Sequence, residues 1–289
     1  MSGRILVIGR SGQLATALQR VGGDAVEAWG SDRFDLAETA SMLEKLRQSG
    51  ARAVINAGGY TAVDRAETDR EKAFALNRDG VDALAQACAA LALPLVHLSS
   101  DYVFNGAKDG AYTESDPRAP INVYGQSKAE GEDAVLRQGG SVIRTSWVFS
   151  AYGHNFLRTM LALAEKSDRV SVVVDQVGRP TSAEDLARAC LALAERRDGG
   201  GEVFHFAGAD DATWAEFADG IFAEAAARGL KSARVSRILS AEYPAAATRP
   251  ANSRLDSSKF TAVTGVAPRP WREALRLCMD QIMPLKTAN

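Results

Sequence analysis

Short apolar runs alternate with longer stretches in which apolar residues recur every three or four positions. Consecutive apolar residues are typical of strands buried on both faces of a parallel sheet, and the longer period is typical of helices that cover such a sheet. The apolar runs predict strands over residues 4–9, 25–29, 53–57, 95–99, 141–146, 170–174 and 203–206. The longer stretches predict helices over residues 13–21, 37–48, 70–91, 153–166, 182–196, 214–228 and 271–283, with a further helix beginning near Tyr124.

Alternation of strand and helix along the chain is the signature of a doubly wound α/β fold. We therefore predict a Rossmann-type parallel sheet with a smaller C-terminal substrate-binding lobe. The nucleotide-binding domain is expected over residues 1–150, with returning segments near 170–207, and the substrate lobe mainly over 151–289. A chain of 289 residues with 46% hydrophobic residues has enough length and apolar content for both parts.

Charge and cysteine content narrow the classes of function. The net charge of -2 and pI near 6.0 provide no basic field, which argues against a nucleic-acid binder or a membrane-surface protein. Cys88, Cys190 and Cys278 are far apart in helical patterns and are expected to be buried free thiols. The first apolar run is too short for a signal peptide, and no apolar run is long enough to span a membrane, so we expect a cytoplasmic protein.

A glycine turn follows the first predicted strand and leads into a helix. It reads G-x-x-G-x-x-A and contains Gly9, Ser11, Gly12, Gln13 and Leu14. Such a turn exposes backbone N–H groups at the helix N-terminus, where a dinucleotide diphosphate can bind. A plain tight connection is the alternative.

The next two strand ends offer further cofactor contacts. After the second strand, Asp32 is suited to a ribose 2′-hydroxyl and Arg33 to a 2′-phosphate, so the sequence does not choose between NADH and NADPH. Asp35 and Leu36 follow and are expected to flank the adenine, or else Asp35 caps the next helix.

After the third strand, two glycines permit close approach of the backbone to a ligand. The residues concerned are Ala57, Gly58, Gly59 and Tyr60. In the long helix that follows, Asn77 interrupts the apolar face; it is a candidate cofactor contact and must find a hydrogen-bond partner if it is buried.

Tyr124 and Lys128 provide the candidate chemistry. Four residues apart, their side chains lie on one face of a helix that begins near Tyr124. Lowering the pKa of a phenol from about 10 toward 7 takes about 4 kcal/mol, and a neighbouring ammonium or a nicotinamide cation acts in that direction. A Tyr-x-x-x-Lys pair is a weak motif by itself.

Taken together, the motifs resemble those of the extended short-chain dehydrogenase/reductase superfamily and, within it, the family of dTDP-4-dehydrorhamnose reductases. The resemblance covers nearly the whole chain. It rests on the glycine turn and on the segments 56–64, 99–106, 120–128, 144–149, 155–156, 175–181 and 249–255.

The resemblance implies a role for each matching residue. Tyr124 protonates the carbonyl oxygen, Lys128 lowers the pKa of Tyr124 and binds the nicotinamide ribose, and Ser100 holds the substrate oxygen. Most relatives have Thr at the position of Ser100, and the hydroxyl is retained here. The implied substrate contacts are Thr61, Val63, Ser100, Tyr102, Tyr124, Trp147, Asn155, Arg249 and Arg254. Arg249 and Arg254 lie in a loop with two prolines, expected over the site, and are candidates for the diphosphate; solvated surface arginines are the alternative.

The implied function is NADPH- or NADH-dependent reduction of the C4 ketone of dTDP-4-dehydro-L-rhamnose, the last step of dTDP-L-rhamnose synthesis. Related dehydratases have a Glu directly after the Asp of this motif, whereas Tyr102 follows Asp101 here, which favours simple reduction. A reductase or epimerase of another nucleotide sugar stays open, as does a non-catalytic regulator, since the regulatory β-subunit of methionine adenosyltransferase is similar. Some relatives form Mg²⁺-linked dimers; the sequence is compatible with a homodimer but does not indicate a metal.

Overall fold

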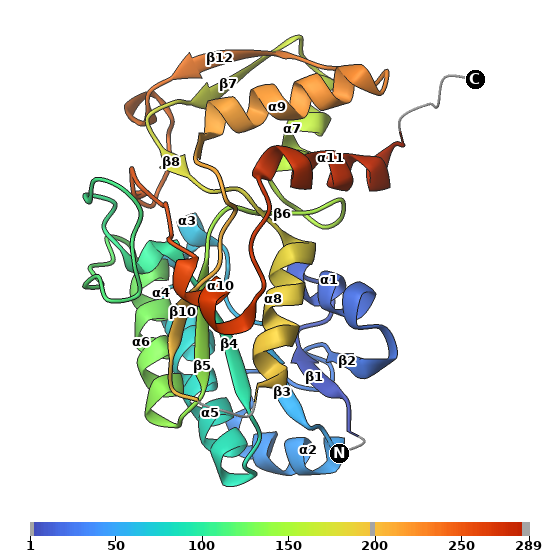
Figure 1. The fold of residues 1–289 in the computed structure, drawn as a ribbon. Coiled ribbons are helices and arrows are strands. Elements are labelled where there is room, and N and C mark those ends of the chain that lie inside the picture. Colours follow the sequence, from blue (N-terminus) through green and yellow to red (C-terminus); the bar gives the residue numbers. More distant parts are fainter. Residues whose placement is uncertain (1–2, 197–199, 285–289) are drawn as a thin grey trace.

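The computed structural model describes residues 3–196 and 200–284 (Figure 1). Its main sheet has six parallel strands in the order β10-β5-β4-β3-β1-β2. These strands are β1 (Ile5–Ile8), β2 (Val26–Trp29), β3 (Ala53–Asn56), β4 (Leu95–Ser100), β5 (Ser141–Thr145) and β10 (Val203–His205). The predicted doubly wound parallel sheet is confirmed.

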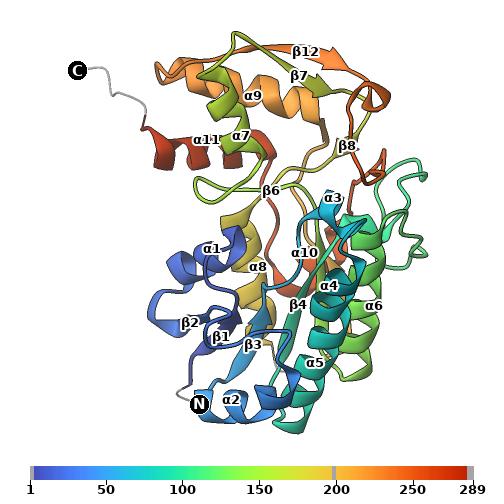
Figure 2. The ribbon, with the colours of Figure 1, turned by 180° about the vertical axis from the view of Figure 1, so that it is seen from behind.

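Burial on both faces explains why the strands are continuous apolar runs. In β1, Ile5 and Val7 belong to one apolar core and Leu6 and Ile8 to the other, because successive side chains point to opposite faces. Helices α1 (Gln13–Gly22) and α8 (Ala183–Glu195) pack together on the first face. Figure 2 shows the other face, which is covered by α2 (Met42–Ser49), α4 (Arg70–Phe74), α5 (Gly80–Ala90) and α6 (Val123–Arg137).

The strand order reverses between β1 and β3, and ligands of such sheets bind where it reverses, beyond the carboxyl ends of the strands. The two turns that follow β1 and β3 lie against each other there. Gly9 has φ 103°, and a Cβ on it would lie 3.3 Å from the backbone N of Gly58. Only glycine combines this backbone conformation with so close an approach.

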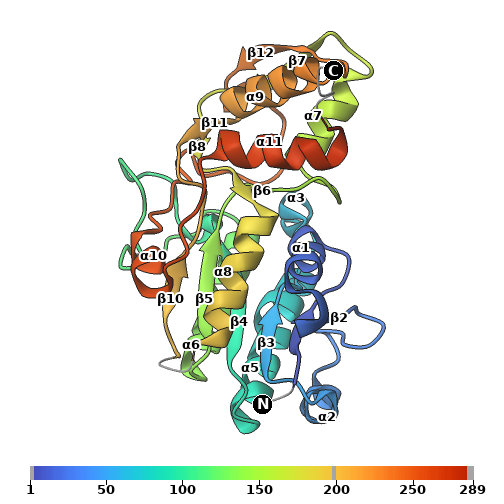
Figure 3. The ribbon, with the colours of Figure 1, turned by 45° about the vertical axis from the view of Figure 1, so that its right-hand side comes forward.

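A smaller lobe lies beyond the carboxyl ends of the main strands (Figure 3). Its parallel pair is formed by β7 (Arg169–Val173) and β12 (Arg234–Ile238), and its helices are α7 (Phe156–Ala164), α9 (Trp214–Ala227) and α11 (Trp271–Ile282). Phe217 and Trp271 pack edge to face in its core. Two short pairs accompany it, β6 (Val148–Phe149) with β9 (Thr181–Ser182) and β8 (Val177–Gly178) with β11 (Ala212–Thr213).

The segments that return to the main domain are α8, β10 and α10 (Ser258–Thr264). The return therefore begins at α8 and not near residue 170, because β7 pairs with β12 in the small lobe. The predicted helix over 70–91 consists of α4, a π-helical turn over 75–79 and α5. The helix predicted over 37–48 begins only at Met42, after a short 3₁₀ turn.

Candidate active site

The glycine turn presents an uncapped helix N-terminus to open space. Gly12 is the N-cap of α1 and makes no side-chain capping bond, and a Cβ placed on it would meet no atom within 4 Å. Ser11 and Gly12 are exposed. Free N–H groups at an open helix start are suited to a diphosphate, so these residues fit the dinucleotide that the sequence motif implies.

The next two residues of the turn, Gln13 and Leu14, face the protein. The amide of Gln13 donates to Val148 O (3.2 Å) and accepts from Ser150 Oγ (2.7 Å), while Leu14 packs against the core beneath α1. Gln13 therefore ties the glycine turn to the segment that leads into the small lobe.

Asp32, just after the end of β2, is paired with Arg10, a residue that was not among those predicted from the sequence. Arg10 Nη1 lies 3.0 Å from Asp32 Oδ2 and, chiefly through this hydrogen bond, lowers the pKa of the Asp32 carboxyl. Arg33 instead contacts Glu27 (3.0 Å) and lies over the ring of Trp29. The carboxyl ends of neighbouring parallel strands lie at the same edge of a sheet. The residues that follow β1 and β2, Arg10 and Asp32 among them, could therefore have been predicted to lie close together.

Asp35 shapes the turn before α2. Its Oδ1 accepts the N–H of Ala37 at 2.9 Å, while Leu36 is buried and its backbone carbonyl lies against Gly80. Asp35 thus caps a turn and not α2 itself. Flanking of an adenine by Asp35 and Leu36 stays a prediction.

Asn77 is fully buried in the π-helical turn and binds the loop after β3. Its side chain accepts from Tyr60 N (2.8 Å) and donates to Tyr60 O (3.0 Å) and to Ser127 Oγ (3.0 Å). The expectation that a buried Asn77 finds internal partners is confirmed. Through Ser127 it also fixes the loop containing Ala57, Gly58 and Gly59 relative to α6.

Ser100, Tyr102 and Tyr124 meet where β4 ends and α6 begins. Ser100 Oγ donates to Asp101 Oδ1 (2.8 Å) and accepts the N–H of Tyr102 (3.2 Å). The rings of Tyr102 and Tyr124 pack edge to face, with centroids 5.7 Å apart. The structure therefore brings together the predicted hydroxyl and the predicted proton donor.

The protein environment raises the pKa of Tyr124. Burial, and then the charge of Asp101, raise the pKa of this phenol to about 12, against a smaller lowering by a hydrogen bond with Ser100. In the protein alone the Lys128 amine contacts Leu98 O and His97 and not the phenol, and the lowering of the Tyr124 pKa by Lys128 stays a prediction. At neutral pH these surroundings keep Tyr124 protonated, which is the form that a proton donor requires.

Three buried polar atoms at this edge have no hydrogen-bond partner among the described residues. They are Ser99 Oγ, Asp101 Oδ2 and Thr145 Oγ1, at the carboxyl ends of the paired strands β4 and β5 and in the turn after β4. Burial raises the pKa of Asp101 to about 6, the largest influence on that group. Buried polar atoms without a partner are costly in a folded protein unless a water or a ligand satisfies them.

The loop with two prolines is fastened over this edge. Arg249 makes a two-pronged contact with Asp64 (Nη2–Oδ2 2.6 Å, Nη1–Oδ1 3.0 Å), and Asp64 also accepts the N–H of Ala247. Asn122, the N-cap of α6, accepts from Gly125 N (2.7 Å) through Oδ1 and donates through Nδ2 to Thr248 O (2.8 Å). The loop is thereby joined both to α3 (Val63–Ala66) and to the helix that carries Tyr124.

The other predicted substrate residues lie around this loop. Arg254 binds Asp211 (3.4 Å) and Asn252, so the structure pairs the two arginines with different acids. Near Asp64, Thr61 is exposed and Val63 is half-buried.

Trp147 and Asn155 connect β5 to the small lobe. Trp147 has φ 49° and stacks on Trp214, with centroids 3.5 Å apart and planes 8° from parallel. Asn155 caps α7 by accepting from Arg158 N, and its amide donates to Ser150 O and to Tyr152 O, so both ends are engaged. Substrate contact by either residue stays a prediction.

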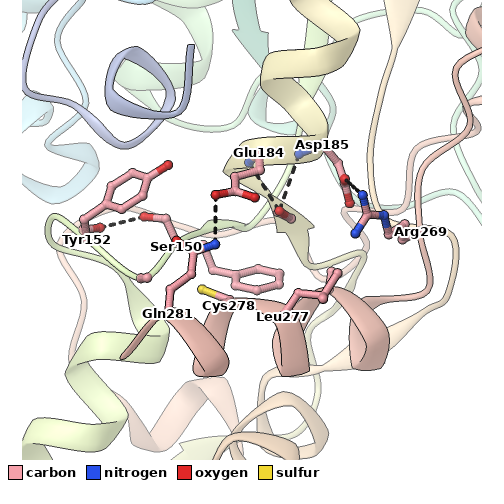
Figure 4. Close-up of a pocket in the computed structure, with 12 residues that line it drawn as sticks. Ser150, Tyr152, Glu184, Asp185, Arg269, Leu277, Cys278 and Gln281 are labelled. Atoms are coloured by element: carbon pink, nitrogen blue, oxygen red, sulfur yellow. Dashed lines mark hydrogen bonds and ion pairs between the residues drawn. The ribbon is translucent and has the colours of Figure 1, made fainter. Parts of the chain in front are cut away.

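A separate small cavity lies between the N-terminus of α8 and α11 (Figure 4). Its polar groups largely satisfy one another: Gln281 binds Glu184 at 2.8 Å and Arg269 pairs with Asp185 at 3.3 Å. None of the predicted site residues lines it.

Residues 3–196 and 200–284 contain no group of three or more His, Cys, Asp or Glu side chains that could hold a metal ion. Within the same ranges, no helix has the length and apolar character needed to cross a membrane. The three cysteines are buried free thiols, as expected.

The sheet, the open glycine turn and the Ser100–Tyr124–Lys128 set define the chain as an extended short-chain dehydrogenase/reductase. Residues 3–283 match the family described as RmlD substrate binding domain. A dTDP-4-dehydrorhamnose reductase of Sinorhizobium fredii is 43% identical, over 94% of this chain and 95% of the relative. That of Aggregatibacter actinomycetemcomitans is 38% identical, over 94% and 97%.

Solved structures agree with these relatives. A crystal structure of dTDP-4-dehydrorhamnose reductase from Bacillus anthracis in complex with NADP superimposes with a TM-score of 0.91 at 30% identity, covering 97% of this chain and 100% of that one. The chain belongs to the dTDP-4-dehydrorhamnose reductase family.

Proposed function

We propose that the protein reduces the C4 ketone of dTDP-4-dehydro-L-rhamnose with NADPH or NADH, giving dTDP-L-rhamnose. The observation that carries this proposal is the cluster of Ser100, Asp101 and Tyr124, with its unpaired polar atoms, at the carboxyl edge of the sheet. The names of the family relatives support the substrate, and the NADP complex of the B. anthracis relative supports the cofactor. A cytoplasmic homodimer belongs to the same proposal.

In this reaction the cofactor supplies a hydride to the keto carbon. Tyr124 holds the proton that the carbonyl oxygen needs, and its raised pKa keeps that proton in place at neutral pH. Ser100 and Tyr102 orient the sugar from the adjacent turn. Arg249 supplies a cation for the nucleotide diphosphate, for which Asp64 competes while no substrate is bound.

Residues of the glycine turn and the adjacent strand ends would hold the dinucleotide. Ser11 and Gly12 would hold its diphosphate, and Asp32 beside Arg10 would hold the adenosine ribose. Because an acid and a cation stand together there, we propose that the protein accepts both NADH and NADPH.

The test is oxidation of each cofactor with a panel of nucleotide keto sugars, followed by absorbance at the nicotinamide band. Tyr124→Phe should lower kcat by about 10²- to 10⁴-fold with cofactor binding retained. Tyr243→Phe, at a tyrosine that is 53% exposed, is the matched control. Wild-type turnover on another sugar but not the dTDP-keto sugar would identify a different reductase, and binding to a partner enzyme with no turnover on any sugar would favour a regulator.

A further inference from the structure

Trp147 and Trp214 form a stacked pair where the main domain meets the small lobe. Trp147 comes two residues after Thr145, which lies opposite Ser100 in the parallel register of β5 and β4. Trp214 is the first residue of α9 in the small lobe. The ring centroids are 3.5 Å apart and the planes are 8° from parallel, so Trp214 covers one face of the Trp147 indole.

The backbone of Gly178 covers the opposite face. A Cβ placed on Gly178 would lie 2.4 Å from Cε2 of Trp147 and 2.8 Å from each of its ring neighbours Nε1 and Cζ2. A point outside Cε2 in the ring plane would be closer to those two neighbours than to Cε2, whereas a point above Cε2 is farther from them, as found here. On the side of Trp214, an atom of that ring would be nearer still, but the three nearest atoms all belong to Trp147. The indole is therefore enclosed on both faces.

Trp147 is also held in an uncommon backbone conformation. Its φ of 49° lies in the left-handed region, where a bulky residue is an outlier. Its carbonyl accepts the N–H of Thr181 at 3.1 Å, and the preceding Ser146 Oγ donates to Arg179 O at 3.1 Å. Strained residues persist where their surroundings fix them, and they are concentrated at functional sites. The conformation therefore supports a functional role for this ring.

The two indole N–H groups differ in their partners. Trp214 Nε1 donates to Gln176 Oε1 at 3.2 Å, and Gln176 Nε2 donates to Ser240 Oγ at 2.9 Å. Phe156 packs against Trp214 with centroids 4.5 Å apart, so several contacts fix the orientation of that ring. Trp147 Nε1 has no hydrogen-bond partner within residues 3–196 and 200–284, and it is not one of the fully buried unpaired atoms. It is a donor that a ligand can reach.

We propose that Trp214 is a positioning residue that holds Trp147 edge-on to the nucleotide sugar, so that Trp147 donates its indole N–H to a sugar oxygen and does not stack on the sugar. This inference rests on the proposed function, which places the sugar beside Ser100 and Tyr124. A sugar hydroxyl or ring oxygen has the lone pair that the N–H requires. Stacking of a sugar or a base would require an open indole face, and both faces are covered.

The stacked pair can be tested without turnover. Two indoles this close couple their electronic transitions, so the far-ultraviolet circular dichroism of the wild type should contain the resulting couplet. Trp147→Phe and Trp214→Leu should each remove it. Trp271→Phe, at a small-lobe tryptophan that packs on Phe217 outside the pair, should retain it. A wild-type spectrum without the couplet, or a couplet that survives either of the first two substitutions, would overturn the arrangement.

The indole donor is tested by ¹H–¹⁵N spectra of the four tryptophan side chains, with Trp147 assigned from the signal that Trp147→Phe removes. Addition of dTDP-L-rhamnose, the product of the proposed reaction, should move the Trp147 N–H signal downfield, because the group becomes hydrogen-bonded. Addition of dTDP, which lacks the sugar, should leave it near its position in the free protein. The same shift with dTDP, or no shift with dTDP-L-rhamnose, would overturn the inference.

In turnover, substitutions of the two tryptophans should act as one. Trp147→Phe removes the N–H and should raise the KM for the nucleotide sugar by about 3- to 10-fold, the value of one hydrogen bond, with the KM for the dinucleotide unchanged. Trp214→Leu should have a similar effect, and Trp214→Phe, which keeps an aromatic ring over Trp147, should restore most of the loss. The double variant Trp147→Phe/Trp214→Leu should be no worse than Trp147→Phe alone.

Fully additive effects, or an equal rise in the KM for the dinucleotide, would show that Trp214 supports the small lobe in general and would contradict the proposal. Trp271→Phe is the packing control and should leave both KM values in place. If Trp214→Leu does not fold, the spectra of the wild type and of Trp147→Phe decide the question. If the wild type does not reduce the dTDP-keto sugar, the proposed function fails, while the spectra with the nucleotide sugar that it does bind still test the contact at Trp147.

Discussion

Asp101 is expected to destabilise the folded protein at neutral pH, because burial of its carboxylate outweighs the hydrogen bonds from Ser253 and Ser100 that favour the charged form. The pKa of this carboxyl is about 6 in the native protein, against 3.8 for an ordinary Asp. The native state therefore binds the proton more tightly than the unfolded chain. Stability from the protonated form is complete below pH 3.8 and is lost as the pH rises through about 6, a total of about 3 kcal/mol.

Asp101→Asn removes this pH dependence while preserving the shape of the side chain. The decisive quantity is the unfolding free energy of the variant minus that of the wild type, because other titrating groups cancel in this difference. It should rise by about 2 kcal/mol between pH 4.5 and pH 7.5, the part of the total that develops in that range. Urea unfolding at both pH values measures it.

The exposed residue of the neighbouring loop, Asp109, supplies the control. Asp109→Asn makes the same chemical substitution at an exposed position, and its difference is subtracted. A corrected rise below about 0.5 kcal/mol would show that the Asp101 carboxylate is well solvated in the native state, and the reasoning from burial would be refuted.

Two further substitutions test buried contacts that hold the site in place. Glu132→Gln should lower the unfolding free energy by about 3–5 kcal/mol, because it leaves Arg144, only 3% exposed, without its buried carboxylate. Glu130→Gln removes a partly exposed pair on the same helix and should lower the unfolding free energy by less than about 1 kcal/mol; similar losses from the two variants would contradict this prediction. Gly178→Ala should cost about 1–3 kcal/mol in urea unfolding, since the added Cβ would lie 2.4 Å from a Trp147 ring atom that the stacked Trp214 keeps from yielding. Trp147→Phe in the same chain should recover part of that loss, and full additivity would argue against the clash.

The main sheet was predictable because burial on both faces produces uninterrupted apolar runs, and the alternation of β1 between two cores confirms that reason. Helix starts were less predictable. The Asp35 side chain accepts a hydrogen bond from Ala37 N in a turn, and the next helix begins only at Met42. Side-chain hydrogen bonds of this kind compete with those of a helix, and the periodicity of apolar residues does not reveal them.

The candidate site was predictable as a set of residues but not as a network. Helical spacing indicated Tyr124 and Lys128, and the family resemblance indicated Ser100. Whether the pKa of Tyr124 is raised or lowered depends on its burial and on the orientation of the Lys128 amine. The spacing of two residues on a helix determines neither. The contact between Asp64 and Arg249 joins segments that are far apart in the chain, and local sequence patterns do not predict such contacts.

The side-chain amide of Asn122 makes two different hydrogen bonds, one as acceptor and one as donor. It must offer an acceptor to the first turn of α6 and a donor to a carbonyl of the overlying loop. Aspartate has no donor, and serine and threonine are one atom shorter, so the usual helix-starting alternatives each satisfy only half of the requirement. Selection from a saturated library at this codon should consequently return asparagine almost alone, even though the side chain itself performs no chemistry.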